Sequence, residues 1–268
     1  MRAALLLLLA LPACTCTGVN RGDVVTMTVG QEWALGRELA AEVDAQTTPL
    51  RSEAAQATLD AVGAALAART EFAGHPWRFT VLDDASANAF ALPGGHVYVH
   101  AGLLAAAESE SELAAVLAHE VSHVVARHSS ERMAKAHGLS LLLGLLLGDD
   151  PGLARQLAAE LVGRGALARF SRTDEREADR LGLRYLAEAG YDPEGMVALF
   201  ETLTQLRARQ PAAFERWFAT HPLGEERAEA ARTLVAEAPQ AVAAPPEVPF
   251  AAARAEARRR TARPTATP

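Results

Sequence analysis

Two histidines four residues apart constrain this chain more than any other feature of its sequence. His119 and His123 lie in the pattern H-E-x-x-H, within a segment whose apolar residues recur at helical spacing. On an α-helix, residues four apart project from the same face, so both imidazoles can reach one point. Two neutral imidazole nitrogens at this spacing suit a tetrahedral Zn²⁺ ion, with room for a third protein ligand and a water molecule. Glu120 would then lie beside the metal, where its carboxylate can take a proton from that water.

The residues around this pattern predict a helix rather than a loop. Ser109 and Glu112 have the spacing of a capping box at a helix start. The apolar residues that follow at helical spacing are Leu113, Val116, Leu117, Val121, Val124 and Val125. The alternative is a pair of unrelated core or surface histidines with a chance glutamate between them, and a third metal ligand would decide against it.

A second predicted helix supplies candidates for that third ligand. Ser171 and Asp174 form another capping-box pattern, and Glu175 and Asp179 follow it on one helix face. Glu175 would complete a His₂Glu set for one zinc ion per chain. Asp179 could accept the spare N–H of a zinc-binding histidine and fix its tautomer. Taken alone, these residues would indicate only an exposed, charged helix start; together with the first motif they predict a zinc-dependent peptidase.

A small antiparallel sheet is predicted just before the helix that carries the H-E-x-x-H pattern. Strand-like segments occur at residues 77–82, 88–92 and 96–100. The turn signal Pro93-Gly94-Gly95 separates the last two. In zinc peptidases of this kind, an edge strand beside the metal-binding helix can hold a substrate backbone by strand addition. The residues expected to do so are Asn88, Gly94, Gly95, His96 and Val97. His96 and His100 are interpreted as sheet residues rather than metal ligands.

The first 13 residues resemble an export signal, in which Arg2 precedes an apolar run and then small residues. The run is too short to remain as a membrane-spanning helix. Leu11-Pro12-Ala13-Cys14 resembles the bacterial lipobox, in which the cysteine is lipidated and becomes the new N-terminus; cleavage by ordinary signal peptidase is the alternative. Thr15, rather than Asp, follows that cysteine, and resemblance to enterobacterial lipoprotein sorting then implies the outer membrane. We therefore expect a periplasmic, lipid-anchored protein held to the membrane by Cys14 through a tether at residues 14–30.

Residues 31–236 are predicted to form one domain, followed by a disordered tail at residues 237–268 that is rich in Ala, Pro and Arg. This tail could bind protein partners or anionic surfaces. The net charge of −7 argues against nucleic acid as a partner. A leucine-rich run at residues 139–147 is too short to span a membrane. It is interpreted as a buried segment, with a lid over the cleft or a membrane-contacting patch as alternatives.

Four separate stretches resemble one family of metallopeptidases, the gluzincin family that includes the CaaX prenyl proteases and the heat-shock membrane protease. They are NAFALPGG at 88–95, ELAAVLAHEVSH at 112–123, Ser171-Arg172 with Glu175 and Asp179, and Thr220-His221-Pro222. They occur in family order within residues 31–236. The resemblance implies an α+β, mostly helical, zincin-like peptidase domain with the small antiparallel sheet beside the H-E-x-x-H helix.

The resemblance also implies roles for individual residues. Zinc would be bound by His119, His123 and Glu175, with Glu120 as the general base and Asp179 behind His119. His221 would be either a fourth, inhibitory zinc ligand or a donor to the oxyanion. Arg172 matches an arginine near the cleft. Because no transmembrane helix is predicted, prenylated CaaX substrates are not expected. The lipid-anchored periplasmic members imply misfolded or misassembled envelope proteins as substrates instead.

Two other functions remain open on the sequence alone. One is a chaperone-like assembly factor of the outer membrane with a largely closed zinc site that rarely cleaves, which His221 as a fourth ligand would favour. The other is a metal-binding lipoprotein without catalysis. The intact Glu120 argues against the second, because binding a metal does not require it.

Overall fold

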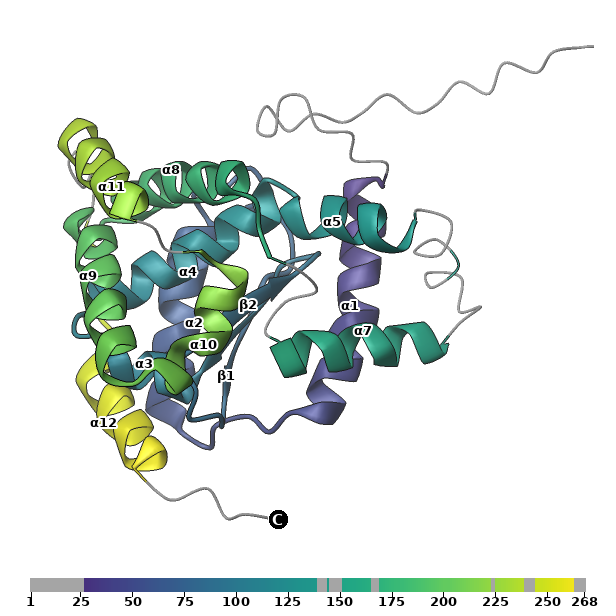
Figure 1. Cartoon of the computed structure of the whole chain (residues 1–268), viewed down its shortest axis with the longest axis horizontal. Coiled ribbons are helices and arrows are strands. Elements are labelled where there is room, and N and C mark those ends of the chain that lie inside the picture. The colour runs from purple at the N-terminus through teal and green to yellow at the C-terminus, as the bar shows by residue number, and fades with distance from the viewer. Residues whose placement is uncertain are drawn as a thin grey trace, which may run out of the picture.

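Helices surround a small three-stranded sheet in the computed structural model of this chain (Figure 1). The structure describes residues 27–138, 144, 151–164, 169–222, 225–238 and 244–262. The strands are β1 (Arg78–Leu82), β2 (Ala89–Leu92) and β3 (His96–His100). The helices are α1 (Val29–Gln46), α2 (Glu53–Ala67), α3 (Ala101–Ala106), α4 (Glu110–Val125), α5 (His128–His137), α7 (Pro151–Arg164), α8 (Arg172–Glu188), α9 (Glu194–Arg209), α10 (Pro211–Thr220), α11 (Glu225–Glu237) and α12 (Phe250–Thr261). The predicted fold class, α+β and mostly helical, is confirmed.

The sheet is mixed rather than antiparallel, with the strand order β1-β3-β2. β2 and β3 are antiparallel and are joined by a tight turn in which Gly94 and Gly95 both have a φ of +77°. β1 pairs in parallel with the other side of β3, with Phe79 opposite Val97. The predicted antiparallel sheet is therefore wrong for β1. The connection at residues 83–88 leads β2 to the far side of β3 instead of forming a hairpin with β1.

The two edges of the sheet differ in how they are covered. On β1, the Val81 carbonyl accepts the Leu50 N–H at 2.8 Å. The Gln56 side-chain amide donates to the Phe79 carbonyl at 2.8 Å and accepts the Val81 N–H at 3.3 Å. These bonds occupy backbone groups that another strand could otherwise use. No strand pairs with the outer edge of β2 within the described part of the chain. The Ala91 carbonyl accepts one long hydrogen bond there, from the Ser129 Oγ at 3.5 Å, and apart from this contact β2 is the open edge.

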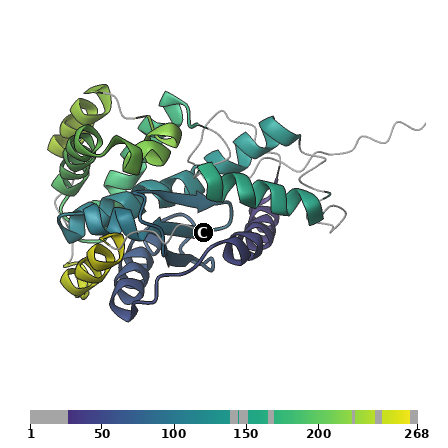
Figure 2. The same cartoon turned by 60° about the horizontal axis from the view of Figure 1, so that its bottom comes forward.

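The sheet separates two hydrophobic cores (Figures 1 and 2). Successive residues of a strand point to opposite faces, and β3 accordingly alternates between the cores. Val97 and Val99 pack with α2, α4 and α8, whereas Tyr98 packs with α1 and α7. The H-E-x-x-H helix therefore lies under one face of the sheet, and α7 lies over the other.

α4 is buried around its whole circumference, and every residue from 112 to 125 is buried. Its N-cap is Ser109, as predicted, whose Oγ accepts the Glu112 N–H at 3.1 Å. The Glu112 carboxylate accepts the N–H of Glu108 instead of closing a box with Ser109. α8 packs along α4, and Gly182 allows this, since a Cβ there would lie 3.2 Å from the Ala118 backbone. The polar side chains of α4 are removed from water and must find partners inside the protein.

The C-terminal segment contains a helix, so the prediction of a disordered tail is wrong for Phe250–Thr261. α12 packs against α2 and α3, and Ala253 and Ala257 are fully buried there (Figure 2). The Arg258 Nε donates to the Ala105 carbonyl at 3.2 Å, and the Glu256 carboxylate accepts a bond from Ser52. A helix that packs through alanines lacks the wide stripe of large apolar residues by which a buried helix is recognised in a sequence.

Several predicted segments lie outside the described residues. These are the export signal at 1–13, most of the tether at 14–30 and, except for Gly144, the leucine-rich run at 139–147. The domain begins slightly earlier than predicted, because α1 starts at Val29 with a complete capping box between Thr28 and Gln31. Of the helices that are described, none combines the length and apolar character needed to cross a bilayer.

Candidate metal centre

Four buried side chains from three parts of the fold converge on one point. His119 and His123 come from α4, Glu175 from the first turn of α8, and His221 from the C-terminal end of α10. The Nε2 atoms of His119 and His123 are 3.1 Å apart. The Nδ1 of His221 lies 3.2 Å from the His119 Nε2 and 3.0 Å from the Glu175 Oε1. Each of the four residues therefore offers one ligand atom to a common centre.

This arrangement fits a zinc ion. Tetrahedral zinc with nitrogen and oxygen ligands at about 2.1 Å places those ligands about 3.4 Å from one another. The separations here lie close to that value: the Glu175 Oε1 is 3.5 Å from the His123 Nε2. Three imidazole nitrogens that face one another also suit a shared cation, because a neutral ring presents a lone pair on the nitrogen without hydrogen.

The local sequence explains how Glu175 reaches the centre. Ser171 and Asp174 form the complete predicted capping box, so α8 begins at a fixed place, one turn before the ligand. Asp179 follows one turn later, and its Oδ1 lies 3.0 Å from the His119 Nδ1. The structure thus places His119, His123, Glu175 and Asp179 together in the geometry that the sequence predicts.

A buried arginine holds the two carboxylates of α8 in place. Arg227, in α11, donates from Nη2 and Nε to the two oxygens of Asp179 at 2.7 and 2.8 Å. It also forms an ion pair with Glu175 and donates to the Pro222 carbonyl at 3.1 Å. Bidentate pairs of this kind are among the strongest protein hydrogen bonds. Arg227 therefore connects the metal ligand, the carboxylate behind His119 and the residue after His221.

The charges of the site shift the pKa values of its members. Burial alone would raise the pKa of Glu175, but the charge of the neighbouring His221 outweighs burial and lowers it far below its usual range. In the same way, Arg227 outweighs burial and lowers the pKa of Asp179. Both carboxylates are therefore anionic at neutral pH, as metal binding and histidine orientation require. Burial lowers the pKa of His123 well below its ordinary value, which leaves the ring neutral and able to bind a metal.

Glu120 lies next to the cluster and has a different environment. Its Oε1 is 3.4 Å from the His221 Nε2 and lacks a hydrogen-bond donor among the described residues. Burial raises its pKa, and the nearby charges of His221 and His119 offset this only in part. A carboxylate in such surroundings is a stronger base than an exposed one.

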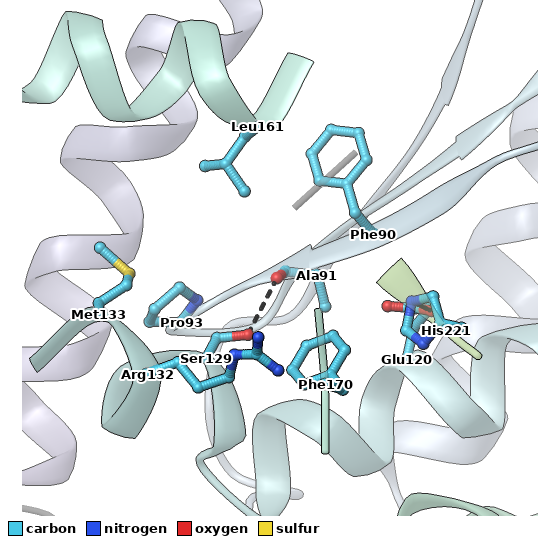
Figure 3. Close-up of a pocket in the computed structure, with 10 residues that line it drawn as sticks. All are labelled: Phe90, Ala91, Pro93, Glu120, Ser129, Arg132, Met133, Leu161, Phe170 and His221. Carbon is cyan, nitrogen blue, oxygen red and sulfur yellow. Dashed lines mark hydrogen bonds and ion pairs between the residues drawn. The ribbon is translucent and has the colours of Figure 1, made fainter. Parts of the chain in front are cut away.

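A cleft extends from Glu120 and His221 along the open edge of β2 (Figure 3). Its other walls come from α5, α7 and Phe170, which lies two residues before α8. The lining residues are Phe90, Ala91, Pro93, Glu120, Ser129, Arg132, Met133, Leu161, Phe170 and His221. The cleft is mostly apolar, with the polar atoms of Glu120 and His221 at one end.

Two groups of predicted site residues lie elsewhere. Arg172 is exposed and faces Glu226 at 3.8 Å, so its predicted place near the cleft is wrong. His96 and Val97 lie on β3, which is paired on both sides and cannot accept a further strand. The predicted substrate strand is therefore wrong for these two residues.

Gly94 and Gly95 are also not positioned to bind a substrate strand, because they form the turn that packs against Trp33 and Trp77. Asn88 directly precedes β2 and is fully buried. His96 and His100 are sheet residues, as predicted.

The comparisons with known proteins agree with this geometry. A model of peptidase family M48 matches residues 53–235, which is more than half of the chain. This chain belongs to peptidase family M48. The predicted gluzincin family is thereby confirmed, and zinc is the metal that M48 peptidases use.

Several members of the family have sequences similar to this chain. The mitochondrial metalloendopeptidase OMA1 of Schizosaccharomyces pombe is 38% identical over 151 residues, which are 56% of this chain and 44% of that protein. The β-barrel assembly-enhancing protease of Escherichia coli is 31% identical over 229 residues, which are 80% of this chain and 45% of that protein. This chain thus spans less than half the length of these relatives.

The sequence did not reveal three residues that shape this M48 site. Arg227 and Arg132 are two of many arginines, and no local spacing marks them. Phe170 stacks on the His123 ring at 3.8 Å between centroids, and the Arg132 guanidinium lies over the Phe170 ring, 4.4 Å from its centroid. Only Phe170 could have been identified from the sequence as a residue near the metal, because it directly precedes the capping box of the helix that carries Glu175.

Proposed function

We propose that this chain is a zinc-dependent endopeptidase of the bacterial envelope that cleaves extended polypeptide segments, with Glu120 as its general base. One observation carries this proposal. The Glu120 carboxylate lies between a zinc-ligand cluster and a cleft that follows the one open edge of the sheet. A bound zinc ion would supply Lewis acidity, which makes water easier to deprotonate and a carbonyl easier to attack.

The residues of the chain carry the proton transfers. Glu120 takes a proton from the attacking water and delivers it to the amine as the peptide C–N bond breaks. Asp179 holds the His119 ring in one tautomer through the contact at Nδ1. The Nε2 of His221 lies 3.4 Å from the Glu120 carboxylate, and both residues line the cleft. The His221 N–H can therefore donate to the developing oxyanion.

The open edge of β2 is the proposed place for the substrate backbone. Because the His100 N–H donates to the Asn88 carbonyl, hydrogen-bonded pairs fall at alternate residues of β2 and β3. Ala89 and Ala91 therefore turn their backbone groups away from β3. A substrate in extended conformation would add there as a further strand, in place of the long bond from Ser129 to the Ala91 carbonyl. This assignment replaces His96 and Val97, which the sequence suggested as part of the edge strand.

We infer that the substrates are misfolded or misassembled envelope proteins and that lipid on Cys14 anchors the chain to the outer membrane. The lipobox-like residues 11–14 support the anchor. The similarity to the Escherichia coli β-barrel assembly-enhancing protease supports the substrate class.

Lipidation can be checked by metabolic labelling with a radioactive fatty acid in a bacterial host. We expect the wild-type chain to carry the label and Cys14→Ser to lack it. Cys16→Ser is the matched control and should be labelled like the wild type. Label on the Cys14→Ser chain would exclude this anchor.

A closed zinc site favours a second candidate function, that of an assembly factor that rarely cleaves. The Nδ1 of His221 occupies the position of a fourth ligand, within 3.2 Å of the His119 Nε2. A site with four protein ligands has no position left for water. Protein binding rather than cleavage would then be the main activity.

His221→Ala distinguishes the two functions, with casein as an unfolded substrate. If His221 restrains an active site, the variant should cleave several-fold faster than the wild type, because a coordination position becomes free. If His221 acts as the oxyanion donor instead, the variant should cleave more slowly than the wild type. The double variant with Glu120→Gln is the control and should be inactive, which attributes the cleavage to this site. If neither wild type nor His221→Ala cleaves while both bind zinc, the assembly-factor function is favoured.

A further inference from the structure

The second ring nitrogen of His123 contacts a histidine that belongs to neither the ligand set nor the cleft. The Nδ1 of His123 lies 2.9 Å from the Nδ1 of His128, the first residue of α5. The Nε2 of His128 lies 3.4 Å from the Glu177 Oε2, on α8. His128 is buried and Glu177 is partly exposed. A chain of polar contacts thus runs from a zinc ligand to the surface.

We propose that His128 is a positioning residue for the zinc ligand His123 and that Glu177 positions His128 in turn. The Nε2 of His123 faces the metal position, so its proton must be on Nδ1. The Nδ1 of His128 then accepts this proton's hydrogen bond, which leaves the His128 proton on Nε2, directed at Glu177. Each ring has one tautomer in this chain, and zinc-binding histidines are commonly fixed through their second nitrogen.

The backbone conformation between α4 and α5 allows His128 to contact His123. If α4 continued unbroken, the residue five positions after His123 would be rotated by about 140° around the helix axis and could not face His123. The helix is instead interrupted at Arg127, which has a φ of 62°, an uncommon conformation for a residue with a side chain. The Arg127 guanidinium is buried and held by Glu32 at 2.9 Å. Costly backbone conformations are retained where the surrounding structure fixes them, often at functional sites.

The two zinc-binding histidines are therefore held in different ways. His119 contacts a carboxylate directly, since the Asp179 Oδ1 lies 3.0 Å from its Nδ1. His123 contacts the imidazole of His128, and the carboxylate of Glu177 is one residue further away. This difference makes His128 the geometric link between α4, α5 and α8 at the metal.

The inference rests on the zinc site of the proposed function, and zinc affinity is its test. Leu is close to His in size but has no acceptor, whereas the Oδ1 of Asn can replace the Nδ1 of His as an acceptor. We expect His128→Leu to weaken zinc binding by roughly 10–100-fold in chelator competition. His128→Asn should restore affinity to within a few-fold of the wild type, and Glu177→Gln should weaken it less than His128→Leu.

Stability of the zinc-free protein is measured beside affinity, because a structural role would change stability alone. His100→Leu is the control. His100 lies on β3 and is also buried, but its Nδ1 contacts Ser86 at 2.9 Å and does not contact a zinc ligand. This variant should lose stability and keep its zinc affinity. Wild-type affinity in His128→Leu, or equal losses in the Leu and Asn variants, would overturn the inference. A wild type that binds zinc and cleaves no casein would contradict only the proposed function.

Discussion

Glu120→Gln is expected to lower the rate of casein cleavage by about 10²–10⁴-fold, the usual contribution of a general base. The amide has almost the same shape as the carboxylate but cannot accept the proton from water. Zinc binding should be retained, because Glu120 is not one of the four residues whose ligand atoms converge. The release of soluble peptides measures casein cleavage, and elemental analysis of the dialysed protein measures bound zinc.

Glu112→Gln is the matched control for this substitution. Glu112 is buried on the same helix, and its carboxylate accepts the Glu108 N–H at 3.1 Å, away from the metal centre. The same chemical change there should leave the rate nearly unchanged. Full activity of Glu120→Gln would remove Glu120 as the base, whereas loss of zinc from that variant would make it a structural part of the site.

Arg227→Met is expected to lower the free energy of unfolding of the zinc-free protein by about 3–5 kcal/mol. The reason is that removal of one partner leaves buried carboxylates without a counter-charge. Asp179 would lose both hydrogen bonds from Arg227 and keep only its contact with His119, and Glu175 would lose its ion pair with Arg227. Chemical denaturation in the presence of a chelator measures this loss. Added zinc should recover part of it, because the ion supplies positive charge to Glu175 and His119.

The pH dependence gives an independent check on the same variant. Because the pKa of Asp179 is lowered in the folded wild type, its contribution to stability is present above its unfolded pKa, about 3.9. This contribution is lost as the pH falls through the lower folded value. In Arg227→Met, burial of Asp179 is no longer offset by the charge of Arg227, so protonation of Asp179 on acidification stabilises the folded variant. The difference between the two proteins should therefore be largest at neutral pH and shrink on acidification.

Arg232→Met provides the control for Arg227→Met. Arg232 lies on the same helix and pairs with Glu201 at 2.9 Å, but both side chains are about half exposed. Its loss should cause little change in stability, since exposed ion pairs contribute little. If the two arginine variants behave alike, burial of the Arg227 cluster does not govern the stability of the site.

The parts of the site that depend on one helix could be predicted from the sequence. The spacing within α4 fixes His119, Glu120 and His123 relative to one another, and the capped start of α8 does the same for Glu175 and Asp179. Helical periodicity and capping are local properties, so a single sequence contains them. Only the family resemblance marked His221.

The parts that depend on contacts between distant segments could not be predicted. The bonds between Arg227 and Asp179 join residues 48 apart in the sequence, and no local sequence pattern at either residue indicates that they are partners. Strand order was missed for the same reason, because alternation identifies a strand but not its neighbours. α12 was missed because its buried face consists of alanines such as Ala253.

The unequal edges of the sheet have a consequence for how copies of the protein behave toward each other. A protein that accepts extended chains at a strand edge also risks accepting the edge of another copy, which leads to aggregation. Here Gln56 and Leu50 already occupy the backbone groups of β1, so that edge cannot recruit a second sheet. The β2 edge is recessed between α5 and α7 (Figure 3). The strand edge of another copy would have to pass between these two helices in order to pair with β2.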